Sequence, residues 1–476
     1  MNFILALAIV AIVCSVCAEA EAKASSCASP SMGLSFYNWD GEKSCNPSTF
    51  SAPATINDVV AFVQRTAAAG SERNKIQSVG GGLSFSGIQL ADDAHMLTLH
   101  RMNKLLHIEW LNGEKGGTGA EVTVQAGTRI RDLVQELDGH GLAMVNLGAT
   151  ANQTIAGACA TGTHGTGKAL GALATSIRGL QLVTASGRVA NVRGDSPDEG
   201  EKALFAAAAT GLGRMGIVTA VTLHTVPQWK MKMEQIPYAL DSLLTELSDL
   251  LQQHPRLQWS WVPYSNNATV VIRTDVPWDT PVSPAGPADD ESDGGCWSNT
   301  QKRNPCTDLS YKTLTDSALH FEQRSLYTEM EMMIPVEHAD AAVHAYIEWM
   351  DTDAVRSQHD AGVTINVMLR YVAGDKLMVS PFSGRDTAVL SFIVLGDSDS
   401  AGNQAEFELY SRGLQELCET RFSGRPHWGK VNWISENTPK YMHSVYPELK
   451  DFQALAKKLD PEQRFFNEYL AARIGQ

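Results

Sequence analysis

The sequence predicts an α+β protein in which two differently patterned regions follow one another. Up to about Val226, short apolar strands alternate with amphipathic helices. Beyond Pro227, Trp259–Val262 and Thr269–Ile272 alternate apolar and polar residues, as antiparallel strands do. A chain of 476 residues is long enough for two or three domains with a sizeable core.

In the first region a helix is expected over Thr55–Ala69, because its apolar residues recur at helical spacing and share one face. A second helix is expected to open at Gly127 and to run through Leu137. Strands are expected around Lys75–Val79, Met96–Leu99, Val122–Val124 and Leu180–Val183.

The second region is expected to be an antiparallel sheet with flanking helices. Residues 277–304 are rich in Pro, Gly, Asp and Ser, which indicates a surface loop. The acidic run Asp289–Asp293 lacks the spacing of a calcium-binding loop, so we expect it to be solvated. Helices are predicted over Tyr238–Leu251 and Glu337–Asp351, and further strands around Val363–Tyr371 and Ala388–Val394.

The first residues are typical of a secretory signal peptide. Phe3–Val13 are apolar, small residues follow at Ala18 and Ala20, and the apolar run is too short to span a membrane. Residues 1–20 are therefore predicted to be a signal peptide, and the chain to be secreted or to reside in the lumen of the secretory pathway. The glycosylation sequon at Asn267 fits this route.

The cysteines fit an oxidising compartment. The pairs Cys27–Cys45 and Cys296–Cys306 each bracket a loop and are predicted disulfides, although spacing alone leaves the pairing open. Cys159 and Cys418 are expected to be free and buried. There is no C-x-x-C after the leader, and no metal site is predicted.

The charge balance argues against two classes of partner. The chain has 38 basic and 53 acidic residues, which give a net charge of −15 at pH 7. Nucleic acids and anionic membranes are bound by basic patches, so neither is expected as a partner. The sequence leaves the oligomeric state open.

Two glycine-rich runs, Gln77–Gly87 and Thr154–Gly167, indicate a binding site. Because glycine has no Cβ, backbone N–H groups in such runs can approach a phosphate closely. Two runs in one half of the chain suggest a long, multiply charged ligand such as a dinucleotide. Neither run has the G-x-G-x-x-G fingerprint of the common dinucleotide fold.

The chain resembles the FAD-linked oxidase family typified by vanillyl-alcohol oxidase, in its sugar-lactone and alditol oxidase branch. The resemblance implies a two-part FAD-binding domain at residues 27–226 and 431–476, and a cap domain at 227–430 built on an antiparallel sheet with flanking helices. It is carried by five stretches in the expected order: Asn38–Gly41, Val79–Phe85, Thr154–Gly167, Gly211–Thr219 and the His-Trp-Gly-Lys motif at His427–Lys430.

The resemblance also implies which residues bind FAD. The sequon at Asn152 lies inside this proposed site, so we expect it to be unused. The implied cofactor-binding residues are Gly80, Gly81, Gly82, Leu83, Ser84, Gly148, Ala149, Thr154, Gly157, Thr161, Gly162, His164, Gly165, Gly167, Ile217 and Val218.

Two of these positions carry specific expectations. Many relatives have a histidine at the position of Leu83 that bonds covalently to the flavin, and leucine has no nucleophilic atom, so FAD is expected to be bound without a covalent link. Gly148 is implied to lie beside the reactive atoms of the flavin. A glycine there leaves room for dioxygen, which favours an oxidase over a dehydrogenase.

The implied catalytic residues are Lys430, Arg370, His427 and Gly148. Arg370 would stabilise negative charge on the reduced ring, and Lys430 would position a substrate oxygen. The main departure from the branch is Met368, which stands where many relatives have a glutamate that binds substrate hydroxyls. Methionine cannot accept a strong hydrogen bond, so either the substrate has fewer hydroxyls or another residue supplies the acceptor.

These features lead us to expect FAD-dependent oxidation of a sugar-1,4-lactone of the gulono-, galactono- or arabinono-lactone type. Dioxygen would be the acceptor, and hydrogen peroxide and an ascorbate-type product would result. Three alternatives stay open: an alditol or other sugar oxidase, a lactone dehydrogenase with another acceptor, and a flavin-binding protein without turnover. Ser391 and Ile393, which replace more polar residues of bacterial alditol oxidases, make alditols a poorer fit.

Overall fold

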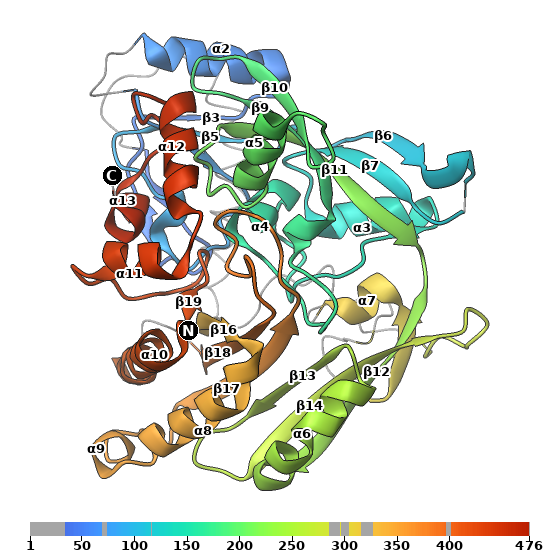
Figure 1. Ribbon diagram of the computed structural model, residues 1–476, viewed down its shortest axis with the longest axis vertical. Helices are drawn as coiled ribbons and strands as arrows, with labels where there is room; N and C mark the ends of the chain where they lie inside the picture. The colour runs from blue at the N-terminus through green and yellow to red at the C-terminus, as the bar shows by residue number, and fades with distance from the viewer. Residues whose placement is uncertain are drawn as a thin grey trace, which may run out of the picture. The chain divides into compact units, whose positions relative to one another are not determined.

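In the computed structural model, structure is described for residues 34–68, 74–115, 117–284, 296, 304–315, 327–396 and 401–475. The predicted signal peptide, Cys27 and the acidic run at 289–293 lie outside these residues. Ser35–Gln476 forms one compact unit, drawn in Figure 1.

The first region contains a small parallel sheet and a larger antiparallel one. The parallel sheet has the order β3-β5-β4, and the antiparallel sheet has the order β10-β9-β11-β7-β6, with β8 paired to β11. A hairpin of β1 and β2 precedes them. The strands are β1 (Phe36–Tyr37), β2 (Ser44–Cys45), β3 (Thr49–Ser51), β4 (Ile76–Val79), β5 (His95–Thr98), β6 (Leu105–Trp110), β7 (Ala120–Gln125), β8 (Leu142–Ala143), β9 (Ile177–Val183), β10 (Val189–Arg193) and β11 (Ile217–Pro227).

The helices of this region follow the predicted apolar spacing. Helix α2 (Ile56–Ala67) begins with a capping box, in which the Thr55 hydroxyl accepts from the Asp58 N–H and the Asp58 carboxylate accepts from the Thr55 N–H. Helix α3 begins at Ile130, three residues later than the glycine that was expected to open it. The further helices are α3 (Ile130–Gly139), α4 (Ile155–Thr161) and α5 (Glu199–Ala209).

The second region is an eight-stranded sheet of order β15-β12-β14-β13-β17-β18-β16-β19, antiparallel throughout. Its strands are β12 (Lys230–Ala239), β13 (Leu257–Trp261), β14 (Asn267–Val276), β15 (Cys306–Leu309), β16 (Tyr327–Pro335), β17 (Thr364–Val372), β18 (Thr387–Leu395) and β19 (Arg425–Pro426). Its helices are α6 (Leu240–Gln253), α7 (Ser310–Leu314), α8 (Ala339–Met350), α9 (Asp353–Arg356) and α10 (Ala401–Phe422).

One predicted boundary in this region was wrong. The helix expected from Tyr238 begins at Leu240, because Tyr238 still pairs with Ala268 as part of β12. The predicted helix over Glu337–Asp351 and the two predicted strands after it match α8, β17 and β18 closely.

The two faces of the large sheet have different partners. Val367, Leu369 and Tyr371 of β17 lie in an apolar core with residues of α6, α8 and α10, and Figure 1 shows these helices along one side of the sheet. Successive side chains of a strand point to opposite faces. Asn366, Met368 and Arg370 therefore lie on the other face, where the candidate site is found.

The last helices pack against the beginning of the chain. They are α11 (Thr438–Val445), α12 (Leu449–Leu459) and α13 (Glu468–Ile474), and Figure 1 shows them in red beside the blue N-terminal elements. The Arg464 guanidinium donates to the Val63 carbonyl at 2.8 Å, and the Asn467 amide donates to the Gln77 side chain at 3.0 Å. This is the return of the chain that the resemblance implies.

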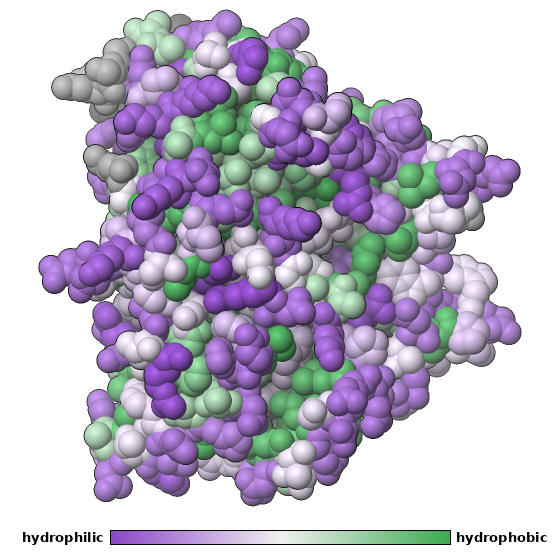
Figure 2. Space-filling view, viewed as in Figure 1, coloured by the Kyte–Doolittle hydropathy of each residue, from purple (hydrophilic) through white to green (hydrophobic). Residues whose placement is uncertain are grey.

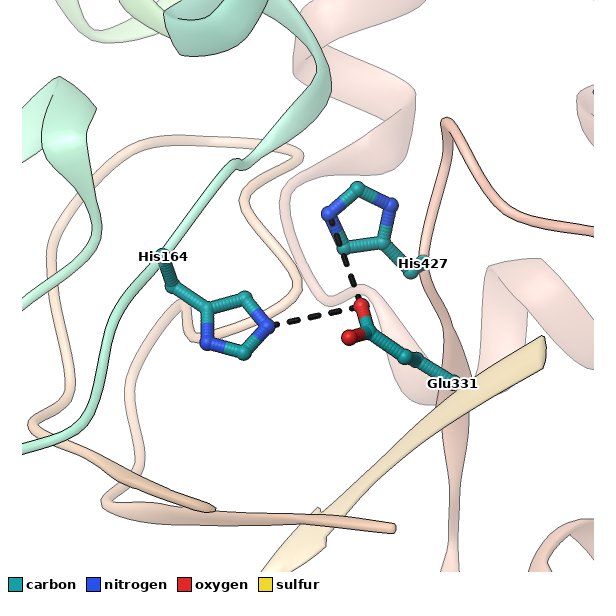
Figure 3. A group of neighbouring side chains, drawn as sticks. All are labelled: His164, Glu331 and His427. Carbon is teal, nitrogen blue, oxygen red and sulfur yellow. Dashed lines mark hydrogen bonds and ion pairs between the residues drawn. The ribbon is translucent and has the colours of Figure 1, made fainter. Parts of the chain in front are cut away.

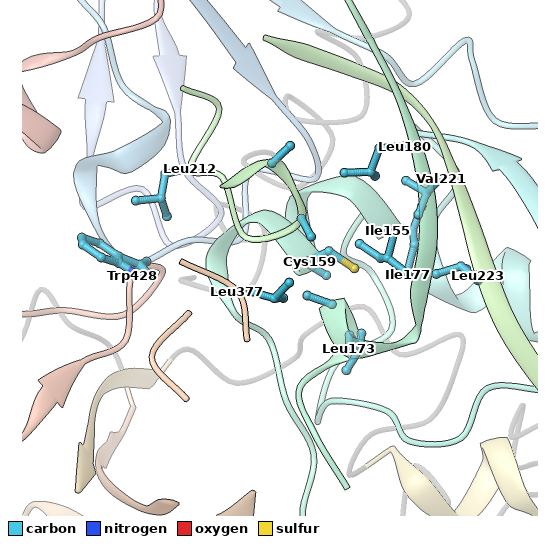
Figure 4. Packing of buried hydrophobic residues seen from close by; sticks show 14 of the residues in the cluster. Ile155, Cys159, Leu173, Ile177, Leu180, Leu212, Val221, Leu223, Leu377 and Trp428 are labelled. Atoms are coloured by element: carbon cyan, nitrogen blue, oxygen red, sulfur yellow. The ribbon is translucent and has the colours of Figure 1, made fainter. Parts of the chain in front are cut away.

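The cysteines agree with prediction in three cases of four. Cys296 and Cys306 form a disulfide, and Cys418 is free and buried. Cys159 is also free and packs in the core with Ile155 and Leu173 (Figure 4). Cys45, which was predicted to pair with Cys27, is instead a buried free thiol 3.6 Å from the sulfur of Met96.

The surface and the helices of the described residues have three further features. Asn267 is exposed at the start of β14, where a glycan would meet solvent. Among these residues, no helix combines the length and apolar character needed to cross a membrane. On the face shown in Figure 2, hydrophilic side chains cover most of the surface.

Candidate active site

A cavity of about 1120 Å³, its open mouth included, lies where the two glycine-rich runs meet. Nine of the predicted cofactor-binding residues line it: Gly80, Gly81, Gly82, Leu83, Ser84, Thr154, Gly157, Thr161 and Val218. The lining also includes Gln153, Gly127 and three glycines of the Gly211–Thr219 stretch, Gly211, Gly213 and Gly216.

The glycines of the first run are sterically required. A Cβ on Gly80 would stand 2.2 Å from the Thr154 hydroxyl oxygen, and one on Gly81 would stand 2.9 Å from the Asn152 carbonyl oxygen. Gly82 has φ +70°, a conformation that side chains disfavour. The first run therefore packs closely against Asn152 and Thr154, with no room for a side chain at Gly80 or Gly81.

The cavity also has a polar atom that a ligand could satisfy. The Gln153 side chain donates to the Thr163 hydroxyl at 3.0 Å, but its Oε1 is buried and has no hydrogen-bond partner among the described residues. Since buried acceptors are nearly always paired, a donor from a bound ligand is expected there. The glycine walls and this acceptor fit the nucleotide cofactor that the resemblance implies.

The His-Trp-Gly-Lys motif is fixed directly to the end of the first glycine run. The Phe85 N–H donates to the Gly429 carbonyl at 2.8 Å, and the Ser86 hydroxyl donates to the Trp428 carbonyl at 2.7 Å. The Trp428 indole is buried, and its N–H donates to the Val379 carbonyl at 2.8 Å. These bonds place Lys430 beside the end of the run that lines the cavity, with its ammonium 5.1 Å from the centre of the Phe85 ring, although Lys430 itself does not line the cavity.

Two buried carboxylates of β16 surround the Lys430 ammonium. Glu329 forms an ion pair with it, and Glu331 Oε1 lies 4.0 Å from Nζ. Burial would lower the pKa of Lys430, but the charges of Glu329 and Glu331 outweigh burial and raise it. Lys430 is therefore a stable cation, which donates hydrogen bonds and does not act as a base.

Glu331 lies between two buried imidazoles, as Figure 3 shows. One of its oxygens is 3.4 Å from His164 Nε2 and 3.9 Å from His427 Nε2, and its other oxygen accepts from the Ser391 hydroxyl at 3.2 Å. Burial would raise the pKa of Glu331, but Lys430 and the two histidines hold it well below its usual value. Glu331 is therefore ionised.

The backbone contacts of the two histidines assign their protons. His427 Nδ1 accepts from the Gly429 N–H at 2.9 Å, so its proton is on Nε2. Burial lowers the pKa of His427 to about 3, so that it is neutral. His164 Nδ1 lies 2.9 Å from the Gly165 carbonyl, which can only accept, so Nδ1 carries a proton, and Nε2 lies 3.4 Å from Glu331.

The same three side chains have ligand atoms within 4.8 Å of one another, a spacing that would admit a metal ion. The surroundings argue against one. The Lys430 ammonium already stands beside Glu331, and the backbone N–H at His427 Nδ1 directs a protonated nitrogen toward the carboxylate. The prediction of no metal site remains a prediction.

Arg370 approaches the site from β17. It is buried, its Nε donates to the Gln258 side chain at 3.3 Å, and it lines a small cavity together with Ala149 and Gly165. Gly148 is packed beside this cavity, since a Cβ there would stand 2.8 Å from a Thr163 methyl group.

The remaining predicted residues do not line the large cavity. Ala149 and Gly165 line the small cavity with Arg370, and His164 belongs to the Glu331 cluster. Gly162 ends α4 in the left-handed conformation. Gly148, Gly167 and Ile217 line neither cavity.

Sequence reasoning missed the residues that surround Lys430 and part of the cavity wall. Glu329 and Glu331 lie in a run of methionines that reads as an apolar strand, and only the alternation of charge within Glu329–Met332 could have drawn notice. Gln153 and Gly127 were also missed.

Known structures share this fold. The crystal structure of cholesterol oxidase from B. sterolicum superposes with a TM-score of 0.72 over 93% of this chain and 97% of that chain, at 16% identity. A solvent-stable cholesterol oxidase superposes with a TM-score of 0.69. The predicted α+β fold is thereby confirmed.

Sequence comparison finds similar proteins along most of the chain. A family model described as an FAD binding domain matches residues 47–193, and one described as D-arabinono-1,4-lactone oxidase matches residues 296–473. L-gulonolactone oxidase from Bos taurus is 29% identical over 92% of this chain and 98% of its own length. L-gulono-1,4-lactone dehydrogenase from Mycobacterium tuberculosis and alditol oxidase from Streptomyces are each 28% identical over 92% of this chain.

The fold and the matched domains define a flavin-dependent oxidoreductase that acts on CH–OH groups. Its cofactor domain is of the FAD-binding type, and its relatives act on small sugar-derived molecules. Within this class, the chain is similar along most of its length to the FAD-linked oxidases of the sugar-lactone and alditol oxidase branch.

Proposed function

We propose that this chain oxidises a sugar-1,4-lactone of the gulono-, galactono- or arabinono-lactone type with dioxygen as acceptor, giving hydrogen peroxide and an ascorbate-type product. The observation that carries the proposal is the fixation of the His-Trp-Gly-Lys motif to the glycine-lined cavity, which brings the Lys430 cluster to the cofactor site. The matches to lactone oxidases along the chain support the substrate class.

FAD, when bound, supplies the hydride acceptor for the C–H bond of the substrate. Lys430 donates a hydrogen bond from Nζ to a substrate oxygen and orients it. Arg370 stabilises negative charge that develops at the site. Leu83 lines the cavity and offers no atom for a covalent bond, so the cofactor is held there without a covalent link.

Gly148 favours dioxygen over another acceptor. One relative is described as a dehydrogenase, which supports the alternative of an acceptor other than dioxygen. The close Thr163 methyl group leaves no room for a larger side chain at position 148, and Gly148 itself lines neither cavity.

The experiment combines spectrum and turnover. The purified chain, without its predicted leader, should be yellow, release FAD in acid, lose its colour anaerobically with an aldonolactone, and regain it in air with peroxide formed. Bleaching without recolouring would indicate a dehydrogenase, and bleaching by alditols alone would indicate an alditol oxidase. A flavin that no candidate reduces would indicate a flavin-binding protein without turnover.

We also propose that the chain is exported. The motivation is the apolar leader and the Cys296–Cys306 disulfide, which fits an oxidising compartment. Expression in a eukaryotic host should release a chain that begins near residue 21 into the medium or the secretory lumen. A full-length cytosolic product would contradict the proposal.

A further inference from the structure

On the face of the large sheet that carries the site, two side chains lie in line across three neighbouring strands. Each of them has a hydrogen-bond acceptor that the described residues leave at least partly unpaired. Asn366 of β17 lies opposite Ile393 of β18, and Ile393 lies opposite Glu329 of β16. Residues directly opposite in antiparallel strands point to the same face. Asn366 and Glu329 therefore flank Ile393 on the face that bears Lys430.

Asn366 has an unfilled acceptor. Its Oδ1 is buried and has no hydrogen-bond partner among the described residues. A buried polar atom left unpaired costs about 1–3 kcal/mol, so such atoms in native proteins usually meet a ligand or a water. The fold thus keeps at this point an acceptor that its own chain does not use.

Glu329 has spare capacity of the same kind. Its side chain is 7% exposed, and within the described part of the chain Lys430 is its one hydrogen-bond donor. A carboxylate has about four lone-pair sites, so most of its acceptor capacity stays open. Glu331 differs, because His164 and Ser391 already contact its two oxygens.

The neighbouring set of opposed residues on this face contains Met368, which leaves substrate hydroxyls without a strong acceptor. Met368 lies opposite Ser391, and Ser391 lies opposite Glu331. Met368 offers substrate hydroxyls no strong acceptor. Asn366 is two residues before Met368 on the same face of β17. Glu329 lies on β16, two strands away from β17, so the backbones at Asn366 and Glu329 are about 9–10 Å apart at the usual strand spacing.

We propose that Asn366 and Glu329 together accept hydrogen bonds from the hydroxyl groups of the substrate, and that this pair selects a polyhydroxylated molecule. The inference rests on the proposed function for the position of the substrate. Lys430 holds the Glu329 carboxylate in place, and Ile393 and Met368 offer an apolar surface to the C–H groups between the hydroxyls.

The test compares Asn366→Leu and Glu329→Gln in the flavin-loaded chain. Binding of a non-oxidisable polyhydroxylated lactone analogue is measured from the change in flavin absorbance, beside binding of the same analogue with one hydroxyl removed. We expect the dissociation constant of the full analogue to rise roughly 3–10-fold for Asn366→Leu and roughly 10–100-fold for Glu329→Gln. For at least one deoxy analogue, the same substitution should change binding less than 2-fold.

Glu348→Gln is the matched control, because it makes the same chemical change on the exposed side of α8. It should leave binding of both analogues unchanged. If Glu329→Gln fails to fold, Asn366→Leu carries the test alone, since it removes the acceptor without breaking an ion pair.

Two negative results have different meanings. Suppose that lactones reduce the wild-type flavin but both variants bind the full analogue as tightly as wild type. The proposal that Asn366 and Glu329 bind substrate hydroxyls is then overturned, while the proposed function stands. If no lactone reduces the wild-type flavin, the proposed function fails. The pair is then tested by the same binding comparison with polyols, and equal binding by wild type and variants overturns it.

Discussion

Replacing Lys430 by methionine should destabilise the protein strongly. The Lys430 ammonium contacts Glu329 and lies 4.0 Å from Glu331, and neither carboxylate side chain is more than 7% exposed. Methionine fills a similar volume but leaves two buried negative charges beside each other. Removal of one partner from a buried ion pair costs about 3–5 kcal/mol, and we expect a loss of this size near pH 8.

The loss should shrink as the pH falls. The pKa of Glu331 is held low by Lys430 and the histidines against the effect of burial, so its stabilising contribution is present above the unfolded pKa and is lost as the pH falls through the folded pKa. Burial already raises the pKa of Glu329 despite Lys430. Without the lysine, both pKa values rise, so the carboxylates of the variant take up protons at a higher pH than those of the wild type.

Urea unfolding, followed by tryptophan fluorescence on the flavin-loaded chain, measures this effect. Lys202→Met is the matched control, because Lys202 pairs with Glu199 on the surface of α5, and the pair is 41% and 84% exposed. Exposed pairs contribute about 0–1 kcal/mol. A Lys430→Met loss no larger than that of the control, or one that is larger at pH 4.5 than at pH 8, would refute the reasoning.

Three other predictions follow from the same geometry. Gly80→Ala should abolish or greatly weaken FAD binding, because the added Cβ would stand 2.2 Å from the Thr154 hydroxyl oxygen, where an ordinary contact needs 3.4–4 Å. Gly139→Ala, with nothing within 4 Å of its Cβ, should keep the flavin content of wild type by absorbance. Gly148→Ala should slow reoxidation of the reduced flavin by dioxygen, measured by stopped flow, at least 10-fold more than it slows reduction by substrate. Peptide mapping under non-reducing conditions should find Cys45 alkylated as a free thiol, and a linked Cys27–Cys45 peptide would show that the sequence prediction was right.

Much of the fold could be predicted because the residue patterns that identify its helices and strands lie within single segments of the sequence. The periodic apolar residues of α2 and the apolar runs of β17 and β18 identify these elements without knowledge of their partners. The start of α6 was misplaced because Tyr238 and Ala239 also fit the helical pattern, and only the pairing of β12 with β14 assigns them to a strand.

The site could be predicted only in part, for a related reason. The glycine runs and the His-Trp-Gly-Lys motif are contiguous in sequence and stand out by themselves. Glu329 and Asn366 become neighbours of the site only through the register of β16, β18 and β17. No local pattern encodes that register, so the acceptors that compensate for Met368 could not be identified from the sequence.

The central claim is that the Lys430 cluster and the glycine-lined cavity form one active site that oxidises a sugar lactone with dioxygen. Anaerobic stopped-flow mixing of the flavin-loaded chain with gulono-, galactono- and arabinono-1,4-lactone, followed by mixing with oxygenated buffer, tests it most directly. We predict that at least one lactone bleaches the flavin in the wild type, that oxygen restores the colour with one peroxide per flavin, and that Lys430→Met is reduced at least 100-fold more slowly. A flavin that no lactone reduces, or a Lys430→Met variant that is reduced as fast as wild type, would contradict the claim.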